Sequence, residues 1–122
     1  YLLMYMIMFV LHDPNKLDEV LYAWDETGVK GITVIPSTGL ERLRKSKLLR
    51  EDLPLMPCIQ NIFDQEEIMN RTLITIVKDD EMIHAVVEAT QKVIGDLNEP
   101  NTGILSVLPL LQVYGLDRKD ND

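Results

Sequence analysis

The alternation of apolar and polar segments constrains this chain most strongly, because one strand–helix–strand pattern occurs in it twice. In the first half, an unbroken apolar segment at 1–11 precedes a helical pattern at 16–24 and a β-branched segment at 31–35. In the second half, strand-like segments at 72–78 and 103–108 flank a helical pattern at 80–94. Two such halves within 122 residues predict a single ferredoxin-like domain with the element order βαββαβ.

We therefore expect an α+β fold with a four-stranded antiparallel sheet, two helices on one face and a long insertion between strands 2 and 3. The domain is expected to occupy residues 1–116, the insertion about 38–71, and a polar C-terminal tail 117–122. A connection as long as this insertion is uncommon in a compact domain and usually serves a function or is disordered.

The ends of both helices carry recognisable signals. Asn15 is expected to cap the first helix, because a short polar side chain can accept hydrogen bonds from the first-turn amides. Either Asp79 or Asp80 is expected to cap the second helix in the same way. Gly28 and Gly95 follow the last apolar positions and are typical of residues that end a helix.

The predicted strands are apolar on both faces. Residues 2–11 do not alternate, and Thr75 is the only interruption between 73 and 77. A sheet with helices on one side leaves its second face polar when that face meets water. We therefore expect the second face to be covered. Copies of the same sheet in a closed homo-oligomer are the simplest cover, and the alternative is the insertion folded across it.

The charge and cysteine content exclude some functions and indicate a compartment. The formal net charge of −8 argues against general nucleic-acid binding, which needs lysine and arginine for phosphate contacts. The single cysteine, Cys58, allows no internal disulfide and fits a reducing cytosol. The apolar segment 1–11 has no basic leader and is too short to span a bilayer, so we interpret it as a buried strand of a cytoplasmic protein.

The sequence contains no recognisable catalytic motif, and we expect no catalytic residue and no metal site. Neither GxxxxGK[ST] nor GxGxxG is present. His12 and His84 are the only histidines, and His84 falls on the polar side of the second helix. Cys58 is interpreted as a small hydrophobic residue of the insertion. His12 with Asp13 could contribute to a metal site, but no further ligand has a matching spacing.

A basic cluster opens the insertion, and its members are Arg42, Arg44, Lys45, Lys47 and Arg50. In an acidic chain such a cluster can hold a phosphorylated ligand or an acidic partner protein. The alternative is a solvated helix face on which Glu41 and Lys45 form an i, i+4 pair.

A second candidate binding element precedes the last strand. Thr102 and Gly103 end a turn and could present backbone N–H groups to an anion. The alternative is that this stretch serves only as a turn. In a symmetric ring both this turn and the base of the insertion would lie near a subunit boundary, where ligand clefts often occur.

Residues 10–34 resemble the start of the PII nitrogen-regulatory signalling proteins. That family has a strand, a proline, a helix that begins K-L-D-[DE]-V and a second strand that reads G-[VI]-x-G-[ML]-T-V. The chain has KLDEV at 16–20 and GVKGITV at 28–34, with one extra residue before the turn that leads from the proline into the helix. The strand and helix start at 74–80 and the strand at 103–107 follow the family's order.

The resemblance implies a function. PII proteins are trimers of ferredoxin-like subunits that bind ATP or ADP between subunits, sense 2-oxoglutarate and insert a long loop into a target protein. Here it implies a homotrimer assembled through the sheet and a non-catalytic regulator of an enzyme or membrane transporter. A nucleotide, ATP or ADP, or another small anion would be the effector. The basic cluster would then form part of the loop that docks on the target.

The resemblance also implies a set of effector-binding residues. Thr33 matches a family threonine near the adenine, Gly39 the glycine at the base of the loop, and Arg42 the arginine that follows it. Thr102 and Gly103 would shape the same pocket, and Arg118 would replace one member of a C-terminal arginine pair. Ile104 stands where the family's glycine-rich phosphate loop ends in a lysine.

Two other classes share the fold and stay open. A trimeric metal-binding protein of the CutA type would need more ligands than two separated histidines. A small ferredoxin-like enzyme, such as an isomerase or monooxygenase, would need a convergent site, for which Tyr5, Tyr22 and His12 are the candidates.

Overall fold

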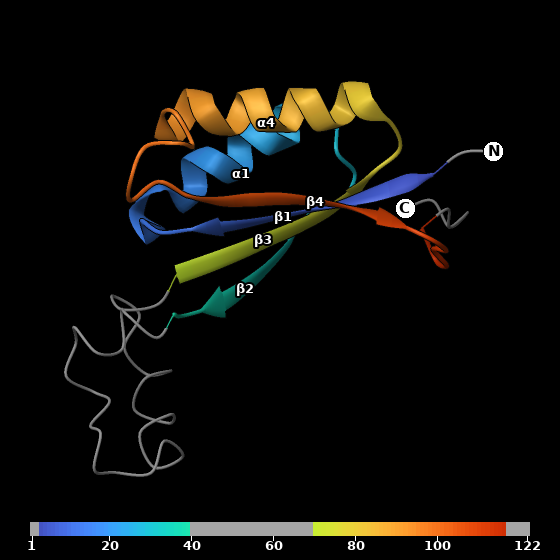
Figure 1. Cartoon of the computed structure of the whole chain (residues 1–122), viewed down its shortest axis with the longest axis horizontal. Coiled ribbons are helices and arrows are strands. Elements are labelled where there is room, and N and C mark those ends of the chain that lie inside the picture. Colours follow the sequence, from blue (N-terminus) through green and yellow to red (C-terminus); the bar gives the residue numbers. More distant parts are fainter. Residues whose placement is uncertain (1–2, 40–69, 117–122) are drawn as a thin grey trace, which may run out of the picture.

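The computed structural model describes residues 3–39 and 70–116, which form one sheet covered by two α-helices (Figure 1). The elements in chain order are β1 (Met4–Leu11), the 3-10 helix η1 (Pro14–Lys16), α1 (Leu17–Glu26), β2 (Thr33–Ser37), β3 (Asn70–Val77), α4 (Asp80–Ile94) and β4 (Gly103–Leu110). The strand order is β2-β3-β1-β4, and all neighbouring strands are antiparallel. The predicted ferredoxin-like fold is therefore confirmed.

The two central strands are β1 and β3, and the two edges of the sheet are β2 and β4. In the register, Phe9 of β1 lies opposite Leu73 of β3 and Leu105 of β4. Each edge strand contains a proline, Pro36 in β2 and Pro109 in β4. Proline has no N–H for a strand ladder, which suits it to edges rather than to the centre of a sheet.

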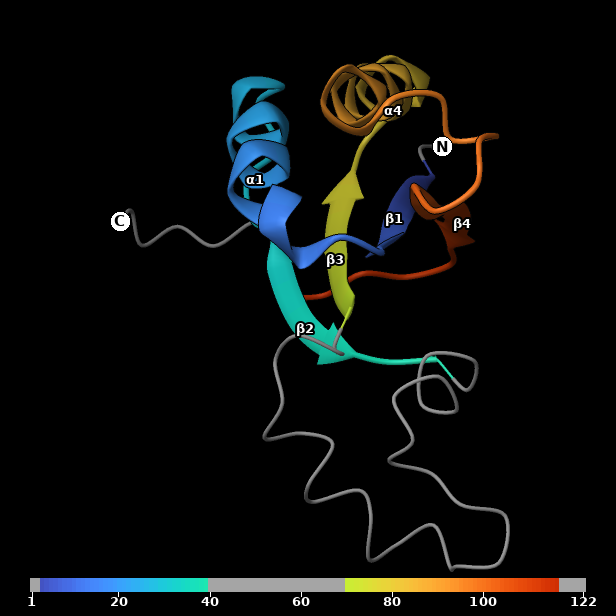
Figure 2. The ribbon, with the colours of Figure 1, turned by 90° about the vertical axis from the view of Figure 1, so that its left-hand side faces the viewer.

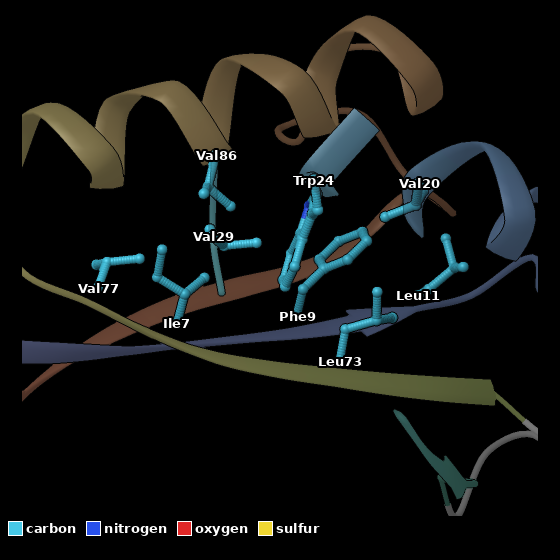
Figure 3. Close-up of a cluster of buried hydrophobic side chains, with 9 residues drawn as sticks. All are labelled: Ile7, Phe9, Leu11, Val20, Trp24, Val29, Leu73, Val77 and Val86. Carbon is cyan, nitrogen blue, oxygen red and sulfur yellow. The ribbon is translucent and has the colours of Figure 1, made fainter. Parts of the chain in front are cut away.

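The core lies between the helices and one face of the sheet. Figure 2 shows α1 and α4 side by side over the same face. Alternate residues of β1 point into this layer, because successive side chains of a strand project to opposite faces. Figure 3 shows the fully buried apolar side chains of this core cluster, which are Ile7, Phe9, Leu11, Val20, Trp24, Leu73 and Val86.

One aromatic pair and one buried hydrogen bond fix α1 relative to its neighbours. The Phe9 and Trp24 ring centroids lie 6.3 Å apart with a 39° interplanar angle, a tilted geometry that aromatic pairs favour. The Trp24 indole Nε1–H donates to Thr90 Oγ1 of α4 at 2.8 Å, and this hydroxyl donates to the Val86 carbonyl at 2.7 Å. Every polar atom of this contact is therefore paired.

The predicted cap of the first helix is wrong. Asp13, rather than Asn15, caps η1 and accepts a hydrogen bond from the Asn15 amide at 3.0 Å. The reason is Pro14, whose fixed φ starts a 3-10 turn before Asn15 is reached. Helix α1 then continues from Lys16, which makes no side-chain capping bond.

The predicted ends of the second helix are confirmed. The Asp79 carboxylate caps α4 and accepts from the Met82 amide at 2.9 Å. Gly95 follows the helix with φ +91°, a conformation that glycine adopts without a steric penalty. The strand bounds differ by about two residues from the expectation, because β3 begins earlier, at Asn70, and β2 begins later, at Thr33.

We predict that Thr90→Val destabilises the protein by about 1–3 kcal/mol, because the buried indole N–H of Trp24 loses its acceptor while side-chain volume is kept. The free energy of unfolding from urea titration measures this effect. Thr90→Ser keeps the hydroxyl and serves as the control. Equal stability of Thr90→Val and the parent protein would contradict the role assigned to this hydrogen bond.

Candidate functional site

The centre of the sheet face opposite the helices is apolar, whereas β2 places Thr33 and Ser37 on this face and β4 places Ser106 there. The register places Met6 and Met8 of β1 beside Ile76 and Ile74 of β3, and Leu108 lies opposite Met6 on β4. In the single chain, Ile104 is 60% exposed and Leu108 43% exposed. The predicted apolar second face is confirmed for the centre of the sheet. No helix of the described residues covers it (Figure 2), and its cover by other copies or by the insertion stays a prediction.

The candidate effector-binding residues fall into two groups on opposite edges of the sheet. Thr33 begins β2 and is exposed, and Gly39 is exposed just beyond the end of the same strand. Thr102 and Gly103 are half-buried at the start of β4. Gly39 and Gly103 lie at the same end of the sheet, but β3 and β1 separate their edges by roughly 14 Å. One protomer therefore does not bring the two groups together.

The remaining predicted site residues lie outside the described residues. They are Arg42, Arg44, Lys45, Lys47, Arg50 and Arg118. Their roles as effector contacts or as a docking surface stay predictions.

The turn before β4 is held by its own polar groups. The Thr102 hydroxyl donates to the Glu99 carbonyl at 2.9 Å, and the Asp96 carboxylate accepts from the Asn98 amide at 2.9 Å. Asn101 has φ +66°, in the left-handed region that asparagine tolerates. The side chain of Thr102 thus has a structural use in this turn, whatever the turn binds.

Gly103 has a packing reason to be glycine. Its φ is +148°, and a Cβ at this position would lie 2.5 Å from the Val10 carbonyl oxygen and 2.7 Å from Phe9 Cε1. A side chain would therefore collide with the central strand and with the core. The sequence interpretation, which treated Gly103 only as part of a turn or an anion site, missed this constraint.

A polar corner at the base of the insertion also escaped the sequence analysis. The hydroxyls of Ser37 and Thr72 lie 2.8 Å apart and form a hydrogen bond between β2 and β3. Asn70 lies opposite Ser37 in the register and is only 7% exposed, yet its Oδ1 has no hydrogen-bond partner within 3–39 and 70–116. A buried unpaired acceptor is unusual in native proteins. Asn70 directly follows residues 40–69, which lie outside the described residues.

The residues proposed for other chemistry are dispersed. His12 is half-buried just after β1, whereas His84 is exposed on α4. Within 3–39 and 70–116, no three His, Cys, Asp or Glu side chains form a group that could hold a metal ion. In the same ranges, no helix is both long and apolar enough to cross a membrane.

Comparison with known families identifies the class of this protein. The family model for nitrogen regulatory protein P-II matches residues 4–120, which is nearly the whole chain. The chain therefore belongs to the P-II family, as the motifs at 16–20 and 28–34 predicted. Proteins of this family are signal-transduction regulators that act on partner proteins. A search of curated proteins found no match.

We predict that Gly103→Ala destabilises the fold by about 1–3 kcal/mol, because the added methyl group overpacks against Val10 and Phe9. Gly31→Ala is the matched control, since a Cβ there meets nothing within 4 Å. Thermal or urea unfolding of both variants measures the difference. If the two substitutions lower the free energy of unfolding by the same amount, the packing explanation for Gly103 is wrong.

Proposed function

We propose that this protein is a homotrimeric PII-like regulator. It binds a small anionic effector between subunits and controls a target protein, an enzyme or a membrane transporter, through its long insertion. The observation that carries the proposal is the separation of the candidate binding residues onto opposite edges of the sheet. A closed ring of subunits offers a direct way to join these edges.

The apolar face of the sheet supports the assembly. Met6, Met8, Ile74 and Ile76 form its centre, on the two central strands. Burial of this face against other copies would remove apolar surface from water, which is the main driving force of association. A homotrimer closes on itself, so each subunit presents both edges to a neighbour.

The same ring would complete the effector site. Thr33 and Gly39 on the β2 edge of one subunit would approach Thr102 and Gly103 on the β4 edge of the next. Arg42 and Arg118 would supply positive charge for the phosphates of ATP or ADP. Ile104 has replaced the family's phosphate-loop lysine, so the affinity for nucleotide would depend more strongly on these arginines.

The insertion would change conformation when the effector binds, and it would contact the target protein. An effector shifts a conformational equilibrium only when it binds one state better than the other. Arg42 is at the start of the insertion and could contact the effector directly. Arg44, Lys45, Lys47 and Arg50 would then form the surface that docks on an acidic region of the target. The function is regulatory rather than catalytic, and it would take place in the cytoplasm.

We predict that Met8→Glu converts the trimer to monomer, because it places a carboxylate in the middle of the apolar face, opposite Ile74. Multi-angle light scattering measures the mass, and circular dichroism checks the fold. Tyr22→Glu is the control, because Tyr22 is 68% exposed on α1, away from this face. A trimeric mass for Met8→Glu, or a monomeric mass for the parent protein, would contradict assembly through the sheet.

We predict that ATP or ADP raises the melting temperature and that Arg42→Ala abolishes most of this shift. A ligand at one hundred times its Kd stabilises the native state by about 2.7 kcal/mol. Differential scanning fluorimetry with ATP, ADP and 2-oxoglutarate provides the measurement, and Lys92→Ala on α4 is the control. If no nucleotide raises the melting temperature of the parent protein, the effector assignment is wrong. If a nucleotide raises the melting temperatures of Arg42→Ala and Lys92→Ala equally, Arg42 is not a contact.

A further inference from the structure

A small pocket lies at the end of the sheet where β3 passes into α4, beside the segment that joins α1 to β2. Its volume is about 200 Å³. Its apolar walls include Val29, Ile76, Met82 and Leu116, and its charged residues are Lys30 and Lys78. These residues come from segments far apart in the sequence, so no spacing motif could have indicated the pocket.

The walls of the pocket are fixed by the fold. The Thr75 hydroxyl donates to the Gly31 carbonyl at 2.6 Å and ties the segment before β2 to β3. Val29 is only 8% exposed and belongs to the core. On the other side, Met82 lies in the first turn of α4, where its amide donates to the Asp79 cap. The pocket is therefore largely preformed, which lowers the ordering cost of binding.

The charge of the pocket is opposite to the charge of the chain. The formal net charge of the protein is −8, yet the two ionisable residues that line the pocket are both lysines. Neither Lys30 nor Lys78 forms an ion pair with another described residue. The nearby Asp79 carboxylate does not line the pocket and is engaged as the helix cap.

Lysine stems often cover apolar surface without binding anything, and this is the competing explanation. It accounts for one lysine beside an apolar wall. It gives no reason for two ammonium groups at one preformed hollow, neither of which forms an ion pair within 3–39 and 70–116. An apolar lining with a few polar groups at defined positions is the usual composition of a small-molecule site.

We propose that this pocket binds a small organic anion with an apolar body. The Lys30 and Lys78 ammonium groups hold the anionic end, and the chain of the ligand packs on Val29, Met82 and Leu116. One protomer supplies every one of these residues. Within that protomer the pocket lies at the end of β3, whereas Gly39 and Gly103 lie at the end where β3 begins. The residues that hold the ligand therefore include none of the predicted effector contacts, although Lys30 lies three residues before Thr33.

Hexanoate is the probe that tests this proposal, with ¹H–¹⁵N NMR titration of the full chain as the measurement. We expect saturable shifts confined to residues 28–31, 76–82 and the neighbourhood of Leu116. The affinity should fall as salt is raised, because exposed charges are screened. The double variant Lys30→Gln with Lys78→Gln should bind at least about tenfold more weakly, as expected for the loss of charged hydrogen bonds. Lys92→Gln, at an exposed position of α4 that does not line this pocket, should leave the affinity unchanged.

Two further probes separate the charge from the apolar body. Hexanol lacks the carboxylate and inorganic phosphate lacks the chain, so both should bind at least about tenfold more weakly than hexanoate. Equal binding of hexanoate by the double variant, equal binding of hexanol or phosphate, or shifts centred elsewhere would overturn the proposal. The single lysine variants and circular dichroism check that any loss reflects charge rather than misfolding. Hexanoate should also bind to the Arg42→Ala and Met8→Glu variants. Its binding can then be judged separately from trimer formation and from nucleotide binding.

Discussion

The burial of one face of β1 beneath two helices is the constraint on which the rest of the structure depends. β1 pairs on both sides, so Ile7, Phe9 and Leu11 set the register of β3 and β4 as well as the position of α1. A slip of one residue in a strand moves every side chain to the opposite face. The same register that fills the core therefore places the methionines of β1 on the open face. The two apolar faces are consequences of a single alignment.

Much of the fold could be predicted because the signals are local. The repeated strand–helix–strand pattern gave the topology, and Asp79 and Gly95 gave the ends of α4. The first helix was predicted less well because two local signals compete there. Asn15 has the chemistry of a cap, but Pro14 starts the turn one residue earlier, so Asp13 takes that role. Strand ends were uncertain by about two residues because ladder bonds, rather than side chains, decide them.

The candidate site was harder to predict because its geometry depends on strand order. Thr33 and Gly103 were assigned to one pocket through a resemblance, yet β3 and β1 lie between their strands. The packing role of Gly103 depends on contact with Val10 and Phe9, which are distant in the sequence. The pocket of Lys30 and Lys78 was missed for the same reason. Side-chain chemistry alone identifies candidates, but only the fold shows which of them can act together.

The prolines in the two edge strands have a consequence for the behaviour of the protein at high concentration. An exposed strand edge is a template onto which a further chain can add, and repeated addition leads to fibrils. Pro36 and Pro109 each remove one ladder donor from an edge, and β2 is also short. Both edge strands of the sheet therefore carry a feature that disfavours the addition of a further strand.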